Sequence, residues 1–180
     1  EFFMKEALLV IDVQNDYFPN GKFELYKANK CLINIQKLVE SFRSNHEKVI
    51  FVQHISSKDG VFFVPGTTGV ELHKDLNVKE KDIIVRKNYP NSFLKTNLKE
   101  LLDNENIEEL YVCGMMTHMC VDTTVRAAFD LGYKVKLFSD ACITRDLKFK
   151  EKILKAQDVN DIYMASLNGM FASVISTENL

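Results

Sequence analysis

Hydrophobic residues along the chain fall into short continuous runs that alternate with longer amphipathic segments. Continuous apolar runs are typical of strands covered on both faces, and they predict strands near residues 7–12, 48–54, 82–87, 108–113, 134–138 and 171–175. Helical spacing predicts helices near residues 29–44, 93–104, 119–131 and 149–165. This alternation predicts an α/β fold with three αβα layers and a mostly parallel six-stranded sheet.

Composition and charge narrow the classes of protein to consider. The 180 residues correspond to a single domain spanning residues 1–180, and residues 1–3, before Met4, are expected to lie outside the natural chain. A net charge of −2 with both signs mixed provides no basic face, so nucleic acid is not an expected partner. Because neither a signal peptide nor an apolar stretch of membrane-spanning length is visible, we expect no membrane partner and a cytoplasmic location.

The four cysteines show neither a CxxC pair nor a disulfide framework. Cys31, Cys113 and Cys142 are interpreted as buried packing residues in a reducing cytosol. Cys120 differs because it follows a predicted strand and a turn at Gly114, where a helix opens. Free N–H groups and the helix dipole at such a position favour an anion and lower a thiol pKa, which makes a nucleophile. The alternative is a small apolar residue that packs the first helical turn.

Two charged residues also end predicted strands. Asp12 follows the apolar run 7–11, and Lys87 closes the β-branched run 82–87. Ligands of open parallel sheets bind beyond the carboxyl ends of the strands, so both residues are placed where chemistry usually occurs. The alternatives are that Asp12 caps a turn, although Asp16 is the better capping candidate, and that Lys87 is a solvated flank.

One carboxylate, one ammonium and one thiol at a shared sheet edge support a coherent reaction. Asp12 accepts the proton of Cys120, while Lys87 pairs with Asp12 and favours the thiolate. The thiolate attacks a carbonyl, Asp12 passes the proton to the leaving amine, and water cleaves the thioester. Backbone N–H groups of Met116 and Cys120 are the candidates for the oxyanion site.

The motifs that carry these residues resemble the isochorismatase-like cysteine hydrolase superfamily, which includes nicotinamidases, N-carbamoyl amidases and streptothricin hydrolase. The resemblance rests on Asp12-Val-Gln-Asn-Asp16, on Lys87 with Ser92-Phe93, and on Gly114-Met-Met-Thr-His-Met-Cys120-Val. It implies an Asp-Lys-Cys triad at Asp12, Lys87 and Cys120 and a cis peptide at Met115-Met116 that directs the Met116 N–H into the oxyanion site. It also implies a Rossmann-like sheet with strand order 3-2-1-4-5-6 and a site between strands one and four.

One departure from the family pattern concerns metal. Nicotinamidases carry an Asp-x-His pair after the second strand, whereas this chain has Val52 two residues before His54. Two ligands, His54 and the distant His73, rarely hold zinc. We therefore expect no metal and no cofactor, and we interpret His54 as a pocket or core histidine. Cys120 argues against vinyl-ether hydrolysis and for cleavage of a small amide, lactam or carbamoyl compound. A nicotinamidase-type metal-assisted amidase and a non-hydrolytic redox-sensing or small-molecule-binding protein remain alternatives.

Substrate-binding candidates come from the long connection 56–78 and from three separate residues. Loops of this length are usually functional or disordered, and Phe62 and Phe63 are expected to cover the pocket or a neighbouring subunit. Tyr17, Tyr89 and His118 are further candidates for the pocket wall, although each could simply be packing. The resemblance implies a homo-oligomer, a dimer or tetramer, and residues 162–170 are a candidate contact.

Overall fold

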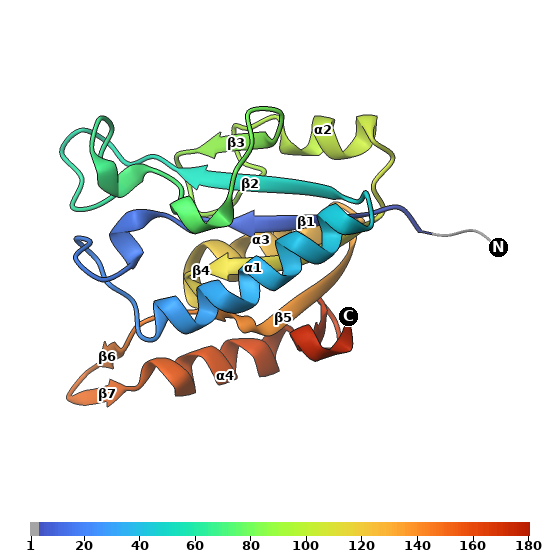
Figure 1. The fold of residues 1–180 in the computed structure, drawn as a ribbon. Coiled ribbons are helices and arrows are strands. Elements are labelled where there is room, and N and C mark those ends of the chain that lie inside the picture. Colours follow the sequence, from blue (N-terminus) through green and yellow to red (C-terminus); the bar gives the residue numbers. More distant parts are fainter. Residues whose placement is uncertain (1–3) are drawn as a thin grey trace.

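Six parallel strands form the central sheet (Figure 1). In the computed structural model, which describes residues 4–180, these strands are β1 (Glu6–Ile11), β2 (Lys48–His54), β3 (Ile83–Lys87), β4 (Glu109–Met115), β5 (Lys134–Ile143) and β8 (Ser173–Ile175). Their order is β3-β2-β1-β4-β5-β8, which confirms the expected 3-2-1-4-5-6 arrangement. The chain adds β2 and β3 on one side of β1, and β4, β5 and β8 on the other. Open α/β sheets bind ligands at such a switch point, which here lies between β1 and β4. The expectation about residues 1–3 lies outside the described part of the chain.

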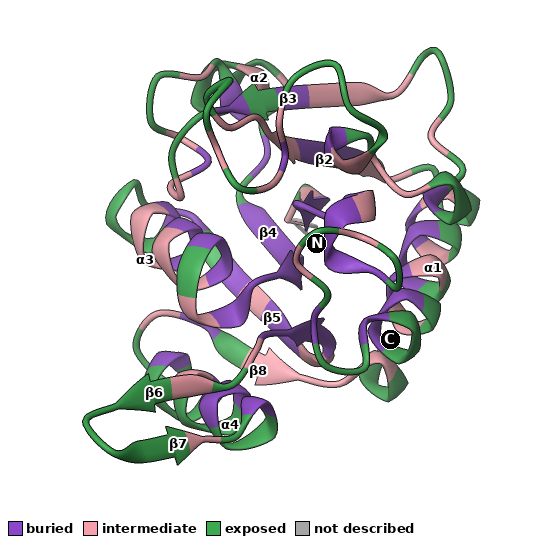
Figure 2. Ribbon diagram, turned by 90° about the vertical axis from the view of Figure 1, so that its left-hand side faces the viewer, coloured by how far each residue is buried: buried purple, intermediate pink, exposed green. Residues whose placement is uncertain are grey.

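Helices cover both faces of this sheet, as the view along the strands shows (Figure 2). They are α1 (Ala28–Ser44), α2 (Leu98–Asn104), α3 (Asp122–Asp130) and α4 (Ala156–Leu167). Alternate side chains of β1 point to opposite faces: Leu8 and Val10 pack with the α1 side, whereas Leu9 and Ile11 pack with residues of α2, α3 and α4. Burial on both faces explains the continuous apolar run, and the three αβα layers are as expected.

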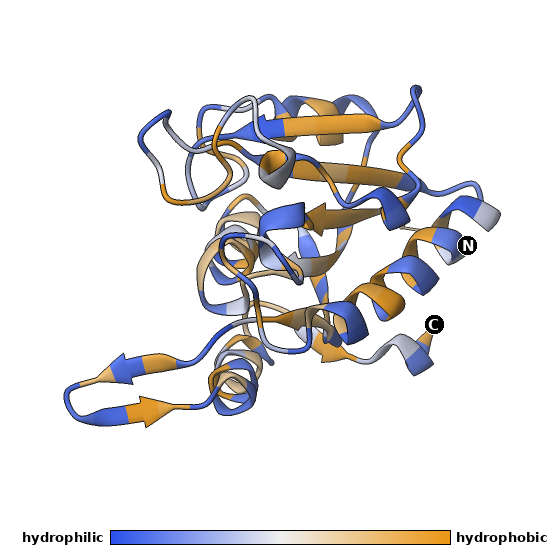
Figure 3. Cartoon of the chain, turned by 60° about the vertical axis from the view of Figure 1, so that its left-hand side comes forward, coloured by the Kyte–Doolittle hydropathy of each residue, from blue (hydrophilic) through white to orange (hydrophobic). Residues whose placement is uncertain are grey.

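The predicted helix 149–165 is wrong in its first part. Residues of this segment form an antiparallel hairpin of β6 (Leu147–Phe149) and β7 (Lys152–Leu154), and α4 begins only at Ala156. Lys150 at the hairpin turn has a φ of 54°, a left-handed conformation that a helix interior cannot contain. The hairpin projects away from the body of the molecule (Figure 3).

The predicted helix 93–104 likewise begins late, at Leu98. Lys95 has a φ of 54°, which interrupts any helix that starts before it. The preceding residues form turns instead, in which the Phe93 N–H donates to the side chain of Asn91 at 2.9 Å.

The turn expected at Gly114 is also wrong, because β4 continues to Met115. Gly114 has a φ of 132°, and a Cβ at this residue would lie 2.1 Å from the carbonyl oxygen of Ile11. Glycine is therefore required by the close approach of β4 to β1. After β4 the chain does not enter an α-helix directly. It first makes a π-helical turn, η4 (Thr117–Val121), which contains Cys120 and leads into α3.

The long connection between β2 and β3 contains two short 3-10 helices, η2 (Thr68–Val70) and η3 (Lys74–Leu76). Two more, η1 (Asn15–Tyr17) and η5 (Thr177–Asn179), follow β1 and β8. Among residues 4–180, none of the helices has the length and apolar character that crossing a lipid bilayer demands.

Candidate active site

The carboxyl ends of four neighbouring strands bring four reactive side chains into one row. Asp12 directly follows β1, His54 ends β2, Lys87 ends β3, and Cys120 lies in the turn after β4. Asp12, Lys87 and Cys120 are buried, with exposed fractions of 0%, 1% and 6%. Arg86, the neighbour of Lys87, is exposed. The alternation along β3 therefore directs Lys87 inward, and the solvated-flank interpretation of this lysine is wrong.

The Lys87 ammonium is the centre of this cluster. Its Nζ lies 2.9 Å from Asp12 Oδ2 and 3.2 Å from Cys120 Sγ. The third neighbour is Nδ1 of His54, at 2.7 Å. An ammonium has three donors and no acceptor, so the three contacts match its full hydrogen-bonding capacity.

The Asp12 carboxylate is held by charge more than by hydrogen bonds. Asp12 adopts a left-handed φ of 54°, and its N–H donates to the carbonyl of Val52 at 3.0 Å. The contact between Oδ2 and Lys87 is an ion pair by distance. Neither carboxylate oxygen accepts a well-aligned hydrogen bond within residues 4–180. The carboxylate therefore keeps lone pairs that can accept a proton.

The Cys120 thiol is less acidic than the sequence suggested. Burial raises the pKa of this thiol well above its usual value, the Asp12 carboxylate raises the pKa further, and Lys87 lowers it. The expected depression by a helix N-terminus is wrong, because Cys120 lies inside a buried π-helical turn and beside a carboxylate. Burial and the neighbouring carboxylate thus favour the thiol over the thiolate at Cys120.

Buried hydroxyl groups tie the segments of the site together. Thr117 Oγ1 contacts Asn160 Oδ1 of α4 at 2.5 Å, which anchors the turn that carries Cys120. On the other side, Thr124 of α3 accepts from the Ser92 N–H at 3.0 Å and lies 2.9 Å from the Ser92 hydroxyl. These bonds connect the chain after Lys87 to the helix after Cys120.

Aromatic residues from two loops gather beside the cluster. The ring of Tyr17 lies 4.6 Å from that of Phe63 and 5.7 Å from that of Phe62. Burial raises the pKa of Tyr17, and the negative charge of Asp12 adds to the effect. Asp16 accepts a hydrogen bond from the Phe63 N–H at 2.8 Å, so its carboxylate organises the loop. The structure thus brings Tyr17, Phe62 and Phe63 together on this side.

Tyr89 and His118, the other two wall candidates, have different surroundings. Tyr89 is exposed, with Lys95 over its ring at 5.4 Å. His118 Nδ1 is hydrogen-bonded to the hydroxyl of Thr144. Within residues 4–180, neither side chain forms a hydrogen bond to Asp12, Lys87 or Cys120.

The remaining three cysteines are free and buried, as expected for packing residues. Burial raises the pKa of each thiol, in the case of Cys142 to about 12.

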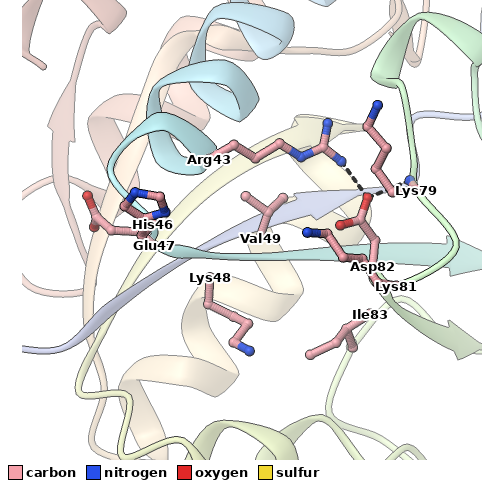
Figure 4. Close-up of a pocket in the computed structure, with 9 residues that line it drawn as sticks. All are labelled: Arg43, His46, Glu47, Lys48, Val49, Lys79, Lys81, Asp82 and Ile83. Carbon is pink, nitrogen blue, oxygen red and sulfur yellow. Dashed lines mark hydrogen bonds and ion pairs between the residues drawn. The ribbon is translucent and has the colours of Figure 1, made fainter.

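A large cavity of about 570 Å³ lies far from this cluster, beside the starts of β2 and β3. It is lined by basic and acidic residues, and the Arg43 guanidinium and the Lys79 N–H both bond to the carboxylate of Asp82 (Figure 4). The lining contains no cysteine, serine or threonine that could act as a nucleophile. The row of side chains at the carboxyl edge remains the better candidate active site.

Sequence reasoning missed the position of His54 in this row. It treated the histidine as one part of an incomplete metal pair and interpreted it as a pocket or core histidine, without a contact to Lys87. The strand order itself contains the missing signal, because β2 lies between β3 and β1. The last residue of β2 must then lie between Lys87 and Asp12, and His54 is paired in register with Lys87.

Comparison with known proteins agrees with the fold. The family model described as Isochorismatase domain matches residues 6–179. The uncharacterised isochorismatase family protein YddQ of Bacillus subtilis is 47% identical over 97% of this chain and 98% of its own length. A streptothricin hydrolase of Streptomyces noursei is 33% identical over 93% of this chain and 58% of its own length.

A solved structure extends the likeness to three dimensions. The cysteine hydrolase from Pseudomonas syringae pv. phaseolicola superimposes with a TM-score of 0.92 and 26% identity, covering 97% of this chain and 90% of that one. The family model spans nearly the whole chain, and the strand order and layers agree with it. The chain therefore belongs to the isochorismatase family and is a hydrolase.

Proposed function

We propose that this protein is a cysteine hydrolase that cleaves the C–N bond of a small amide, lactam or carbamoyl compound through a thioester. The observation that carries the proposal is the buried contact of one ammonium with both a carboxylate and a thiol. Lys87 lies 2.9 Å from Asp12 and 3.2 Å from Cys120. A nucleophile next to a general base is the arrangement that covalent acyl transfer uses, and the fixed cation stabilises the sulfur anion.

In the first half of the reaction, Cys120 Sγ attacks the carbonyl carbon while Asp12 takes the thiol proton. Because burial favours the thiol over the thiolate, this proton leaves as the C–S bond forms. The tetrahedral oxyanion is stabilised by the N–H groups of Met116 and Cys120. Among residues 4–180 no partner is found for the Met116 N–H, and the Met115–Met116 peptide bond is cis. The C–N bond then breaks, and Asp12 returns the proton to the leaving amine.

In the second half, water attacks the thioester carbonyl and Asp12 accepts a proton from it. The C–S bond breaks, the product leaves as an acid, and the proton on Asp12 returns to sulfur. Lys87 keeps its proton throughout. Its positive charge stabilises the sulfur anion each time the anion forms. The same charge offsets the repulsion between the Asp12 carboxylate and that anion.

The state of the thiol favours this reaction over redox sensing. Peroxide-sensing cysteines are typically accessible thiolates, whereas Cys120 is 6% exposed and burial raises its pKa. A general base beside the sulfur is also what a cysteine hydrolase needs to take the thiol proton.

The aromatic group of Tyr17, Phe62 and Phe63 supports a small substrate with an apolar part. We also expect a homo-oligomer, since Ile162 and Met170 are 58% and 70% exposed near the end of the chain, and a cytoplasmic location, since all four thiols are free. Light scattering tests the first expectation: the mass of one chain, 20.7 kDa, would contradict it.

The experiment is a release assay on small primary amides, lactams and carbamoyl compounds, with wild type, Cys120→Ala and Asp12→Asn compared at equal folded concentration. Wild type should release the amine or ammonia from at least one of them. In both variants the rate of release should be lower than in wild type by about 100-fold or more. Undiminished hydrolysis in Cys120→Ala, or no hydrolysis of any compound by wild type, would overturn the proposal.

A further inference from the structure

Three side chains at the candidate active site have the chemistry of a zinc site. One ligand atom from each of Asp12, His54 and Cys120 lies within 4.8 Å of the other two. Carboxylate, imidazole and thiolate are the groups that zinc prefers. This set is different from an Asp-x-His pair, because residue 52 is valine. By donor type alone, the chain carries three zinc ligands in one place.

The Lys87 ammonium already lies among these three groups. Its Nζ is 2.9 Å from Asp12 Oδ2, 2.7 Å from His54 Nδ1 and 3.2 Å from Cys120 Sγ. These are lengths of hydrogen bonds and close ion pairs, whereas zinc bonds to such ligands measure about 2.0–2.3 Å. A second cation at this position would meet the ammonium at short range and in a buried site. The residues therefore do not fit a metal ion.

The contact with Lys87 also determines the tautomer of His54. An ammonium only donates hydrogen bonds, so Nδ1 of His54 must accept. Burial lowers the pKa of His54, and the positive charge of Lys87 lowers it further, although Asp12 opposes this effect. A neutral ring that accepts at Nδ1 carries its proton on Nε2. That proton blocks Nε2 as a metal ligand.

The backbone holds the His54 ring in this position. The Gln14 side chain accepts from the His54 N–H at 2.8 Å and donates to the His54 carbonyl at 2.8 Å. His54 and Lys87 are also register partners on adjacent parallel strands, and such partners project to the same face of a sheet. The Nε2 atom has no partner within residues 4–180 and is not among the buried unpaired atoms, so it is open to solvent.

We infer that Lys87 is the built-in cation of this site and that His54 is its positioning residue, not a metal ligand. His54 then presents an Nε2–H donor, which selects a substrate with a hydrogen-bond acceptor such as a carbonyl or ureido oxygen. The substrate part of this inference rests on the proposed function. The cation and tautomer parts do not, and both tests below are independent of hydrolysis.

The first test reads the tautomer directly. Long-range proton–nitrogen correlation spectra of protein labelled with 15N-histidine at neutral pH distinguish the two neutral tautomers, and His54→Asn identifies the His54 signals among those of four histidines. The expected spectrum has an unprotonated Nδ1 and a protonated Nε2. A proton on Nδ1, in the other tautomer or in a doubly protonated ring, would overturn the inference.

The second test asks whether the ammonium excludes a metal. Cobalt(II) takes the same ligands as zinc and gives a thiolate-to-cobalt absorption band. Wild type should show no such band, and Lys87→Ala should bind one cobalt with the band present. The double variant Lys87→Ala/Cys120→Ser should lack the band, which assigns it to Cys120. A band in wild type, or none in a Lys87→Ala protein that circular dichroism shows to be folded, would contradict the inference. If Lys87→Ala does not fold, the tautomer of wild type decides.

Discussion

The side-chain amide of Gln14 pairs with the main chain of His54 as an additional strand would, accepting from its N–H and donating to its carbonyl, both at 2.8 Å. The same amide nitrogen donates to the carbonyl of Val70, also at 2.8 Å. Gln14 is fully buried. One side chain thus joins the end of β2 to the connection that carries the aromatic residues.

Gln14→Glu should destabilise the protein by roughly 3 kcal/mol. The substitution removes the donor to two carbonyls and places a carboxylate beside them without solvent. Urea unfolding measures the loss. The adjacent Asn15→Asp is the matched control, because the Asn15 amide donates a single exposed bond to Thr68 and its substitution should cost about 1 kcal/mol. Equal costs at the two positions would contradict the assigned role of Gln14.

Gly114→Ala should destabilise the protein by roughly 3 kcal/mol or more. The new Cβ would lie 2.1 Å from the Ile11 carbonyl oxygen, so β1 and β4 must separate. Gly132→Ala provides a control: Gly132 also has a positive φ, 94°, but nothing lies within 4 Å of an added Cβ. Its cost should be about 1 kcal/mol, the strain of the conformation alone. Thermal unfolding of both variants checks the difference.

Stability should fall as the pH is lowered from about 6.5 to about 4. Burial, with a contribution from Arg145, lowers the pKa of His118 to about 4, below its value in the unfolded chain. Between these two values the unfolded state binds more protons, so acid favours unfolding. Replacing His118 with Asn should remove on the order of 1 kcal/mol of this loss at pH about 5, allowing for the solvent screening of a half-exposed group. An unchanged pH dependence of urea unfolding in His118→Asn would refute this prediction.

Phe62→Ala should raise the KM for an amide substrate by about fivefold to tenfold with little change in kcat. Its ring stacks on Phe23 at 4.5 Å and lies 5.7 Å from Tyr17, and aromatic contacts of this kind contribute roughly 1 kcal/mol each. Val61→Ala is the control, because Val61 is 74% exposed. If Phe62→Ala and Val61→Ala have the same KM and kcat, Phe62 does not contact the substrate.

Much of the fold could be predicted because the strands are buried on both faces. Residues 7–11 are all apolar for this reason. The charged residue directly after them, Asp12, can therefore be recognised from the sequence as a candidate site residue. Once Asp12 and Lys87 are placed after parallel strands, their meeting at one edge follows from topology.

The parts that could not be predicted depend on single backbone conformations or on tertiary burial. Left-handed Lys95 and Lys150 interrupt two predicted helices, and nothing in a lysine indicates such a conformation. The acidity of Cys120 depends on what packs around the turn, which no local motif contains. The sequence around His54 lacks the aspartate that a metal pair would have, so it offered no reason to place this histidine beside Lys87. The contact between His54 and Lys87 becomes visible only when β2 and β3 are aligned in register.

Asp12 and Lys87 act on the sulfur of Cys120 with opposite charges. Alkylation of Cys120 by iodoacetamide, followed by peptide mass spectrometry across pH, yields the apparent pKa of this thiol in wild type, Asp12→Asn and Lys87→Met. The wild-type value should lie above the free-thiol value of about 8.5. Removing the carboxylate should lower the pKa by about one unit or more, and removing the ammonium should raise it. A midpoint at or below that of a free thiol, unmoved by either substitution, would show that neither Asp12 nor Lys87 acts on the sulfur.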